Sequence, residues 1–503
     1  MYDLVIETIE DKIIRRRLKI LKFLYDYDQP IYINELVTSI GYKHKTIYND
    51  IDWINDEYKH IIKIYDNKYF FLDISKDKYQ DIIDDIYFNT ISYRLFKSLY
   101  YDEQINIKKF ADENNVSYVN FTRYLNYLNS LINKFNIGIY GPKLHIEGKE
   151  ADIQYFYFNY LFTSNFSLFN NRTNLYYDII MKIINIYLEL GLSSLSIDYN
   201  YASYHLQVIL ERYQVGKYID FEKEIIEEYN QRRSYNNFKN ALYLYSKQNK
   251  LKIINNLDKN VNFVLAFYLL ILDCVNYDVS DNNNTIMVRN DVDISEVMKY
   301  SILTKRVTSQ ICVKDREIFL NKVINNYLLN LNALSIVSPL YQLCNKKIKE
   351  ELKNNQAIIY DLWYRNLQIF IKERRTLFFY LEDIATSLAL LTTKYLIKEL
   401  RKINIVAFIS GEPLIKLYLR KELKALNLNN INLTIISNKL IDNEIIKQDN
   451  IDIIITNYQV NNVETIANNI MIFELSYLPN NREIKEILDY INCLDENRMI
   501  NII

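Results

Sequence analysis

Cysteine and histidine are scarce in this sequence. The 503 residues include four cysteines and four histidines. The cysteines lie far apart and form no CxxC pair; they are Cys274, Cys312, Cys344 and Cys493. No histidine has a second one within reach in sequence, so the ligand spacing of zinc fingers is absent. We therefore expect no metal site, no cofactor and thiols that stay reduced.

An excess of one charge and a long apolar run are also missing. The formal net charge is −1, so nothing marks the chain as a whole as a binder of polyanions. The apolar run Val261 to Val275 is too short to span a bilayer, and no signal peptide is evident. We expect a cytoplasmic protein with no membrane segment.

A helix-turn-helix pattern occupies Gln104 to Glu150. Phe110 and Ala111 are the apolar pair of a short helix that ends in a polar turn. Ser117 is suited to cap a second helix, because its hydroxyl can accept hydrogen bonds from the free amides of the first turn. The second helix has one apolar stripe at i, i+4 and i+7, which we expect to be buried; it consists of Phe121, Leu125 and Leu128. A hairpin follows from Ile137 to Ile146, so the order is that of a winged helix-turn-helix.

The same order occurs earlier in the chain at a constant offset. Phe110 and the three stripe residues correspond to Leu36, Ile47, Ile51 and Ile54. The turn between the helices then contains Gly41, which suits a positive φ. The hairpin of this earlier copy runs from His60 to Ile74. Because a repeat in register is hard to produce by accident, we predict a tandem pair of winged helices.

The exposed faces of the second helices, together with the wings, are the candidate DNA-binding surface. Basic side chains there would hold phosphates, and short polar side chains would lie near base edges in the major groove. The candidates are Lys43, His44, Lys45, Thr46, Tyr48, Asn49, Lys68, Ser117, Tyr118, Asn120, Thr122, Arg123 and Lys143. Any of them could instead be a solvated surface residue. A further basic run, Arg15 to Lys22, is either part of this surface or a solvated helix face.

The middle of the chain is helical, and one motif within it stands out. From Asn170 to Leu400 the pattern predicts amphipathic helices and almost no strands, enough for two bundles. In the first bundle, His205 and Arg212 lie two turns apart on one helix, followed by Gly216. The plain interpretation is an ordinary helix histidine. The alternative is a phosphorylatable His205, whose phosphate would add negative charge beside Arg212.

The last hundred residues change to an α/β pattern. Apolar strands are expected at Asn404–Ser410, Leu433–Ser437, Ile451–Thr456 and Ile470–Glu474. Unbroken apolar strands that alternate with helices indicate a small parallel sheet. The loop Gly411-Glu412-Pro413 is poorly suited to bind an anion, so a dimerising or partner-contacting domain is the better interpretation.

This domain order resembles the Mga-type virulence regulators of Gram-positive bacteria, the group that includes the anthrax toxin activator. The sharpest similarity lies in Val116 to Leu128 and in the wing Gly141 to Glu150. The motif around His205 resembles the phosphotransferase-system regulation domain (PRD), and the last domain resembles enzyme IIB of that system. The second bundle has no histidine, and the enzyme IIB-like domain has no cysteine after its first strand, so no phosphorylation site carries over to either.

The resemblance implies a mainly α, multidomain fold with an α/β end. Two winged helix-turn-helix domains occupy 1–74 and 75–165, PRD-like bundles 166–285 and 286–400, and an enzyme IIB-like domain 401–503. It also implies double-stranded promoter DNA as partner, homodimerisation through the C-terminal half, and a phosphocarrier protein of the sugar system as a further partner.

We therefore expect a transcription regulator, an activator, and not an enzyme. Two alternatives remain from the sequence. One is a phosphotransfer protein of the phosphotransferase system, which the missing cysteine disfavours. The other is an RNA-binding antiterminator, which would begin with a short β-rich RNA-binding module instead of winged helices.

Overall fold

The computed structural model of the chain describes residues 3–27, 30–66, 69–164, 173–190, 197–249, 260–275, 294–311, 314–344, 346–373, 376–396, 403–409, 419, 423, 431–436, 451–457, 470–475, 483–491 and 494. The sequence predictions for Lys68, Cys312, Cys493 and Gly411-Glu412-Pro413 lie outside these residues. The chain divides into two compact units, and each is described by itself. Unit 1 comprises Met1–Met298, Asn325–Asn345 and Arg375–Tyr380; unit 2 comprises Lys299–Ile324, Lys346–Arg374 and Leu381–Ile503.

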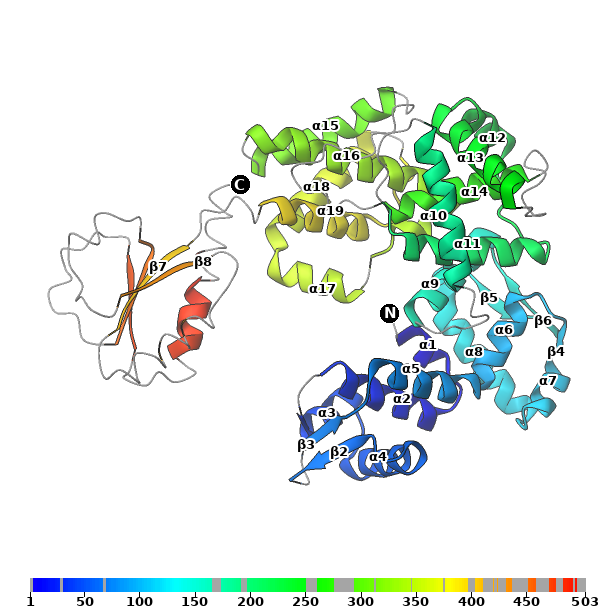
Figure 1. Cartoon of the computed structure of the whole chain (residues 1–503), viewed down its shortest axis with the longest axis horizontal. Coiled ribbons are helices and arrows are strands. Elements are labelled where there is room, and N and C mark those ends of the chain that lie inside the picture. Colours follow the sequence, from blue (N-terminus) through cyan, green and yellow to red (C-terminus); the bar gives the residue numbers. More distant parts are fainter. Residues whose placement is uncertain are drawn as a thin grey trace. The chain divides into compact units, whose positions relative to one another are not determined.

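Unit 1 begins with a short helix, α1, and a first winged helix follows it (Figure 1). The elements are α1 (Asp3–Thr8), α2 (Lys12–Tyr25), β1 (Ile31–Tyr32), α3 (Ile33–Ile40), α4 (His44–Tyr58), β2 (Ile62–Tyr65) and β3 (Tyr69–Leu72). The strands form one antiparallel sheet in the order β1-β3-β2. Gly41 ends α3 with φ +78° and lets the chain turn into α4. We call α2 to β3 the first winged helix.

A second winged helix follows with the same order of elements (Figure 1). Its elements are α5 (Lys76–Phe88), α6 (Ile91–Tyr100), β4 (Ile105–Asn106), α7 (Ile107–Glu113), α8 (Tyr118–Ile132), the 3-10 helix η1 (Asn133–Phe135), β5 (Gly138–Tyr140), β6 (Lys143–Glu147) and α9 (Glu150–Ser164). The strand order β4-β6-β5 repeats that of the first sheet. We call α6 to β6 the second winged helix. The predicted tandem repeat is confirmed in the arrangement of its elements.

One continuous apolar core runs through both winged helices. The predicted stripe residues Leu36, Ile47, Ile51, Ile54, Phe121, Leu125 and Leu128 are all buried in it. Helix α9 completes this core with three fully buried rings, those of Phe156, Tyr157 and Tyr160. Because the core is shared, the two winged helices pack against each other and are not separate domains joined by a linker.

The first helical bundle closes the other side of α9. It consists of α10 (Thr173–Glu189), α11 (Tyr199–Gln214), α12 (Lys223–Asn230), α13 (Arg233–Asn249), α14 (Val261–Ile271) and the 3-10 helix η2 (Leu272–Cys274). Helix α11 contacts α9, α10 and α14, and its buried residues enter the bundle core. Val261–Ile271 is buried on nearly all sides, which explains its unbroken apolar sequence.

The remaining helices follow in chain order. They are α15 (Ile294–Ile311), α16 (Lys314–Val337), the 3-10 helix η3 (Pro339–Gln342), α17 (Lys346–Asn355), α18 (Ala357–Glu373) and α19 (Leu381–Leu396). In unit 2, α17, α18 and α19 pack on one another, and the indole of the buried Trp363 donates to the Thr392 hydroxyl at 2.8 Å. The helical character of the middle of the chain is confirmed. The predicted limits of the two bundles stay a prediction, because each compact unit holds several of the predicted segments.

A four-stranded parallel sheet forms the C-terminal α/β part of unit 2 (Figure 1). Its strands are β7 (Ile403–Phe408), β8 (Ile431–Ile436), β9 (Ile453–Thr456) and β10 (Met471–Glu474), in the order β10-β9-β7-β8. Alternate residues of β7 enter two different cores, with Ile405 in one and Val406 in the other. Both faces of the central strand are therefore buried, as its unbroken apolar sequence predicts. The expected parallel sheet is confirmed.

Candidate DNA-binding surface

The second helix of the second winged helix, α8, is built to present one polar face. The Ser117 hydroxyl accepts from the Asn120 amide at 3.3 Å and caps the helix as predicted. The buried stripe at Phe121, Leu125 and Leu128 fixes the rotation of the helix. Tyr118, Asn120 and Arg123 are exposed, whereas the hydroxyl of the half-buried Thr122 donates back to the Tyr118 carbonyl at 2.8 Å.

Sequence reasoning missed three exposed residues on α8, Val119, Asn126 and Ser130. Val119 is 57% exposed, and it heads an outward stripe at i, i+4, i+7 and i+11. The outward stripe consists of Val119, Arg123, Asn126 and Ser130, all exposed. It lies opposite the buried stripe, since the two are about half a helical turn apart. The helical period would have found Val119 if it had been counted back from Arg123.

The corresponding helix of the first winged helix, α4, has a basic beginning and an acidic end. Lys43, His44, Lys45 and Asn49 are exposed, and Thr46 is half-buried. Tyr48 is also half-buried, and its ring meets Phe70 edge-on with centroids 5.5 Å apart. Asp52, Asp56 and Glu57 are exposed farther along α4. Only the first turns of α4 therefore suit a phosphate backbone.

Helix α8 differs from α4 because it carries no acidic residue. Its single charged side chain is Arg123. The positive end of the helix dipole lies at Tyr118, next to the exposed polar residues. A polyanion can approach α8 along its whole outward face without meeting a carboxylate of the helix itself.

The wings add one described candidate. Gly141 turns the second wing with φ +88°, and Lys143 is exposed just beyond it. Tyr140, on the preceding strand, is also exposed. In the first wing Asp66 has φ 48°, while the candidate Lys68 lies outside the described residues.

Comparison with known families agrees with this geometry. Residues 76–161 match the family model for the Mga helix-turn-helix domain. The chain carries an Mga helix-turn-helix domain. A helix-turn-helix domain of this kind suggests that this part of the chain binds DNA. No curated protein matches the chain significantly.

The matched residues run from the start of α5 into α9. The Mga helix-turn-helix domain therefore contains α8, the second wing and the aromatic helix beyond it. Among the described helices, none is long and apolar enough to cross a membrane. Within the same residues, no group of three or more histidine, cysteine, aspartate or glutamate side chains could hold a metal ion.

The arginines of the basic run on α2 are engaged within the fold. Arg16 and Arg17 both pair with the buried Asp50 of α4, Arg17 at 3.1 Å. Arg17 also covers the Trp53 ring at 3.7 Å. Their interpretation as a solvated helix face is wrong for the same reason. The two arginines hold α4 in place, and the hydrogen bond to Asp50 outweighs burial and raises the pKa of Arg16.

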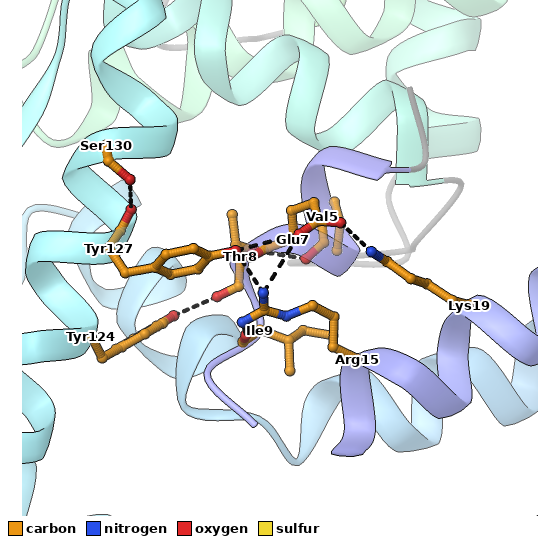
Figure 2. Close-up of polar contacts among 9 residues, drawn as sticks. All are labelled: Val5, Glu7, Thr8, Ile9, Arg15, Lys19, Tyr124, Tyr127 and Ser130. Carbon is orange, nitrogen blue, oxygen red and sulfur yellow. Dashed lines mark hydrogen bonds and ion pairs between the residues drawn. The ribbon is translucent and has the colours of Figure 1, made fainter. Parts of the chain in front are cut away.

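Arg15 of the same run connects the first winged helix to the Mga domain (Figure 2). Its Nη1 donates to the Tyr127 hydroxyl of α8 at 2.7 Å, and its Nη2 donates to the Ile9 carbonyl at 2.7 Å. The Tyr127 hydroxyl donates in turn to the Glu7 carbonyl at 2.9 Å. Glu7 also pairs with Lys19 of α2 at 2.5 Å. Glu7 and its neighbours thus join α2 of the first winged helix to α8 of the second.

Two further contacts extend this junction. The Tyr124 hydroxyl of α8 donates to the Thr8 carbonyl at 2.7 Å (Figure 2). The Glu10 carboxylate accepts from the amides of Ile91 and Ser92, at 2.9 and 3.2 Å, and so satisfies the beginning of α6. Residues 7–10 therefore tie down both α6 and α8 of the Mga domain.

His205 lies between the first bundle and the Mga domain. Its ring is 2% exposed and stacks on Phe158 of α9 with centroids 3.7 Å apart. Its Nε2 lies 3.1 Å from the Asp273 carboxylate, which also accepts from the Tyr201 hydroxyl at 3.1 Å. Tyr341 lies beside it, with ring centroids 5.9 Å apart. The histidine is thus enclosed by aromatic rings and one carboxylate.

Arg212 is engaged elsewhere. It forms a two-pronged pair with Glu150 at the start of α9, with distances of 2.8 and 2.7 Å. Its Nη1 donates to the Tyr100 carbonyl at 2.6 Å. Burial lowers the pKa of Arg212, but the pairing with Glu150 outweighs it and raises that pKa overall. His205 and Arg212 lie on the same helix, but they do not act together. His205 contacts Phe158 and Arg212 contacts Glu150, so each makes its own contact with the Mga helix-turn-helix domain.

Proposed function

We propose that this protein regulates transcription by binding double-stranded promoter DNA through both winged helices, as an activator. The observation that carries the proposal is the pair of exposed recognition helices, α4 and α8, of which α8 belongs to the matched Mga helix-turn-helix domain. The basic side chains at the beginning of α4 and the single arginine of α8, Arg123, suit phosphates, whereas an acidic surface there would repel them.

The roles follow from residue type and, for the described residues, from exposure; Lys68 is included for its residue type alone. Lys43, Lys45, Arg123, Lys68 and Lys143 would contact phosphates, because lysine and arginine neutralise the backbone. The polar residues His44, Thr46, Asn49, Asn120 and Thr122 would lie near base edges, and Tyr48, Ser117 and Tyr118 would adjoin them. Thr122 and Tyr48 are half-buried, so we expect them to support the surface more than to touch bases.

The test is a salt titration of duplex binding by the full chain. Lys45→Ala combined with Arg123→Ala should weaken binding and reduce the slope of log affinity against log salt by about 2, if each residue holds one phosphate. Lys223→Ala combined with Lys346→Ala is the matched control, because it removes two exposed positive charges outside the winged helices. Equal affinity and slope for the two double variants would overturn the assignment of this surface.

We further propose that the C-terminal half sets the oligomeric state, as a homodimer. Two resemblances support this proposal: the helical bundles resemble PRDs, and the parallel sheet resembles enzyme IIB. The segment limits 166–285, 286–400 and 401–503 are part of the same proposal. Dimers would place two sets of winged helices on one DNA and raise affinity through effective concentration. Sedimentation of the full chain across a concentration range tests it, and a monomer at all concentrations would overturn it.

Control by the phosphotransferase system is proposed at His205 only. A phosphocarrier protein would have to reach a ring that is now stacked on Phe158 and held at Asp273, so phosphorylation requires α11 and α9 to separate. Phosphorylation by phosphoenolpyruvate and the general proteins of the system should label the wild type and spare His205→Gln. Labelling of both to the same extent would overturn the proposal.

A further inference from the structure

The exposed first turn of α8 carries an apolar side chain where a solvated helix would have a polar one. Val119 is 57% exposed, and its neighbour Tyr118 is 47% exposed. Val119 is the second residue of the helix, next to the cap at Ser117. A lone exposed apolar residue needs no explanation in general. This one, however, is the first residue of the outward stripe that also contains Arg123.

The neighbours of Val119 determine what can cover it. Asn120 and Arg123 are exposed beside it, and α8 has no carboxylate. An apolar protein partner would bury these polar groups without satisfying them, at a cost. The major groove of DNA offers acceptors and donors for such groups, and it offers one apolar feature, the C5-methyl group of thymine. First-turn residues of a recognition helix are those that reach base edges.

We propose that Val119 is a specificity-determining residue that packs against a thymine methyl group in the major groove. This inference rests on the proposed function, and it makes the two winged helices read different bases. The first winged helix has Lys45 at the position that corresponds to Val119. A lysine favours a phosphate or the acceptors of guanine, so the preferred site is asymmetric, with the thymine on the side of the Mga domain.

The test removes the methyl group alone. Uracil pairs as thymine does and keeps its O4 acceptor, but it lacks the methyl group. A duplex selected from a random pool by the full chain is prepared in two forms, one with thymine and one with uracil at every such position. The wild type should bind the uracil form about fourfold more weakly for each methyl group that it covers. Val119→Ala, whose side chain is shorter, should lose most of this difference.

Two variants serve as controls. Leu175→Ala removes a side chain of similar exposure, 51%, from α10 outside the winged helices, and it should keep the wild-type ratio. Lys45→Ala should lower affinity for both forms and keep the ratio as well. Replacing single thymines by uracil then locates the methyl group that Val119 covers.

The outcomes separate this inference from the function on which it rests. A wild type that binds both forms equally well would overturn the role of Val119 and leave DNA binding intact. The role of Val119 would also be overturned if Val119→Ala kept the full preference for the thymine form, or if Leu175→Ala lost that preference. Failure to bind any duplex would overturn the proposed function and this inference with it.

Discussion

Arg15 donates a hydrogen bond to the Tyr127 hydroxyl at 2.7 Å, across 112 residues of sequence. The first residue belongs to the supporting helix of the first winged helix, and the second to the recognition helix of the Mga domain. The charged donor and the adjacent Glu7 make this a small network whose members support one another. Helix α8 is therefore held by α1 and by α2 of the first winged helix, while its outward stripe stays exposed.

Tyr127→Phe should loosen this junction without opening the core. The variant removes one hydroxyl, and Arg15 and Glu7 each lose a partner, which costs about 1 kcal/mol. Amide exchange in α1 should become roughly fivefold faster. Tyr140→Phe, on the exposed wing, is the control and should leave exchange in α1 unchanged. Wild-type exchange in Tyr127→Phe would mean that packing alone holds the junction.

Arg212→Met should strongly destabilise the contact between the first bundle and α9. The variant leaves Glu150 without its arginine and the Tyr100 carbonyl without this donor. Removing one partner of a buried pair costs about 3–5 kcal/mol. Thermal unfolding should show the loss, and a second change, Glu150→Gln, should restore part of it because the unpaired charge is gone.

The matched control for this pair is Arg306→Met. Arg306 forms an exposed pair with Glu373 at 3.3 Å, and such pairs contribute about 0–1 kcal/mol. Equal losses of stability for Arg212→Met and Arg306→Met would contradict a structural role for the buried pair.

The sequence was sufficient to predict the elements, because their patterns are local. The stripe at Phe121, Leu125 and Leu128 repeats with the helical period, and Ser117 caps its own helix. The inner strands β7 and β9 of the C-terminal sheet are largely apolar because both of their faces are covered. Each of these signals lies within a few residues of the feature that it predicts.

The partners of the charged side chains could not be predicted in this way. Arg16 and Arg17 look like a basic surface in sequence, yet both pair with Asp50 in another helix. Arg212 and His205 share a helix, but Arg212 pairs with Glu150, 62 residues away. Such pairs depend on which helices meet in the folded chain, and hydrophobic periodicity carries no information on that.

Asp84→Asn should stabilise the protein at neutral pH. Burial raises the pKa of Asp84 to about 6, although a hydrogen bond from Gln80 at 2.8 Å opposes the shift. The folded state therefore binds a proton more tightly than the unfolded state, whose value is about 3.9. Stability from this group is present below pH 4 and is lost as the pH rises through 6.

Asp84→Asn avoids this loss of stability because asparagine does not ionise. Its thermal midpoint should exceed that of the wild type by about 1–2 °C at pH 7 and should equal it near pH 4. Asp361→Asn, at an exposed aspartate of α18, should show no such dependence. A constant difference between Asp84→Asn and wild type from pH 4 to pH 7 would contradict the role of burial.

His205→Asp, the usual substitute for a phosphohistidine, should unfold this region instead of imitating the modification. The new carboxylate would lie in an aromatic enclosure beside Asp273, which now lies 3.1 Å from the histidine ring. Burial and the neighbouring carboxylate both disfavour its charged form. We expect the variant to be about 2–3 kcal/mol less stable than His205→Asn at pH 7. The asparagine variant matches it in size and lacks only the charge.

The pH dependence of this difference identifies its cause. Because the folded state raises the pKa of the new carboxylate, the penalty exists above that raised value and disappears as the pH falls toward about 4. Thermal unfolding of His205→Asp and His205→Asn at pH 7 and pH 4 measures it. Equal midpoints at pH 7 would mean that the site tolerates a second negative charge, and the aspartate variant could then be used to test phosphorylation. A difference that persists at pH 4 would point to packing and not to charge.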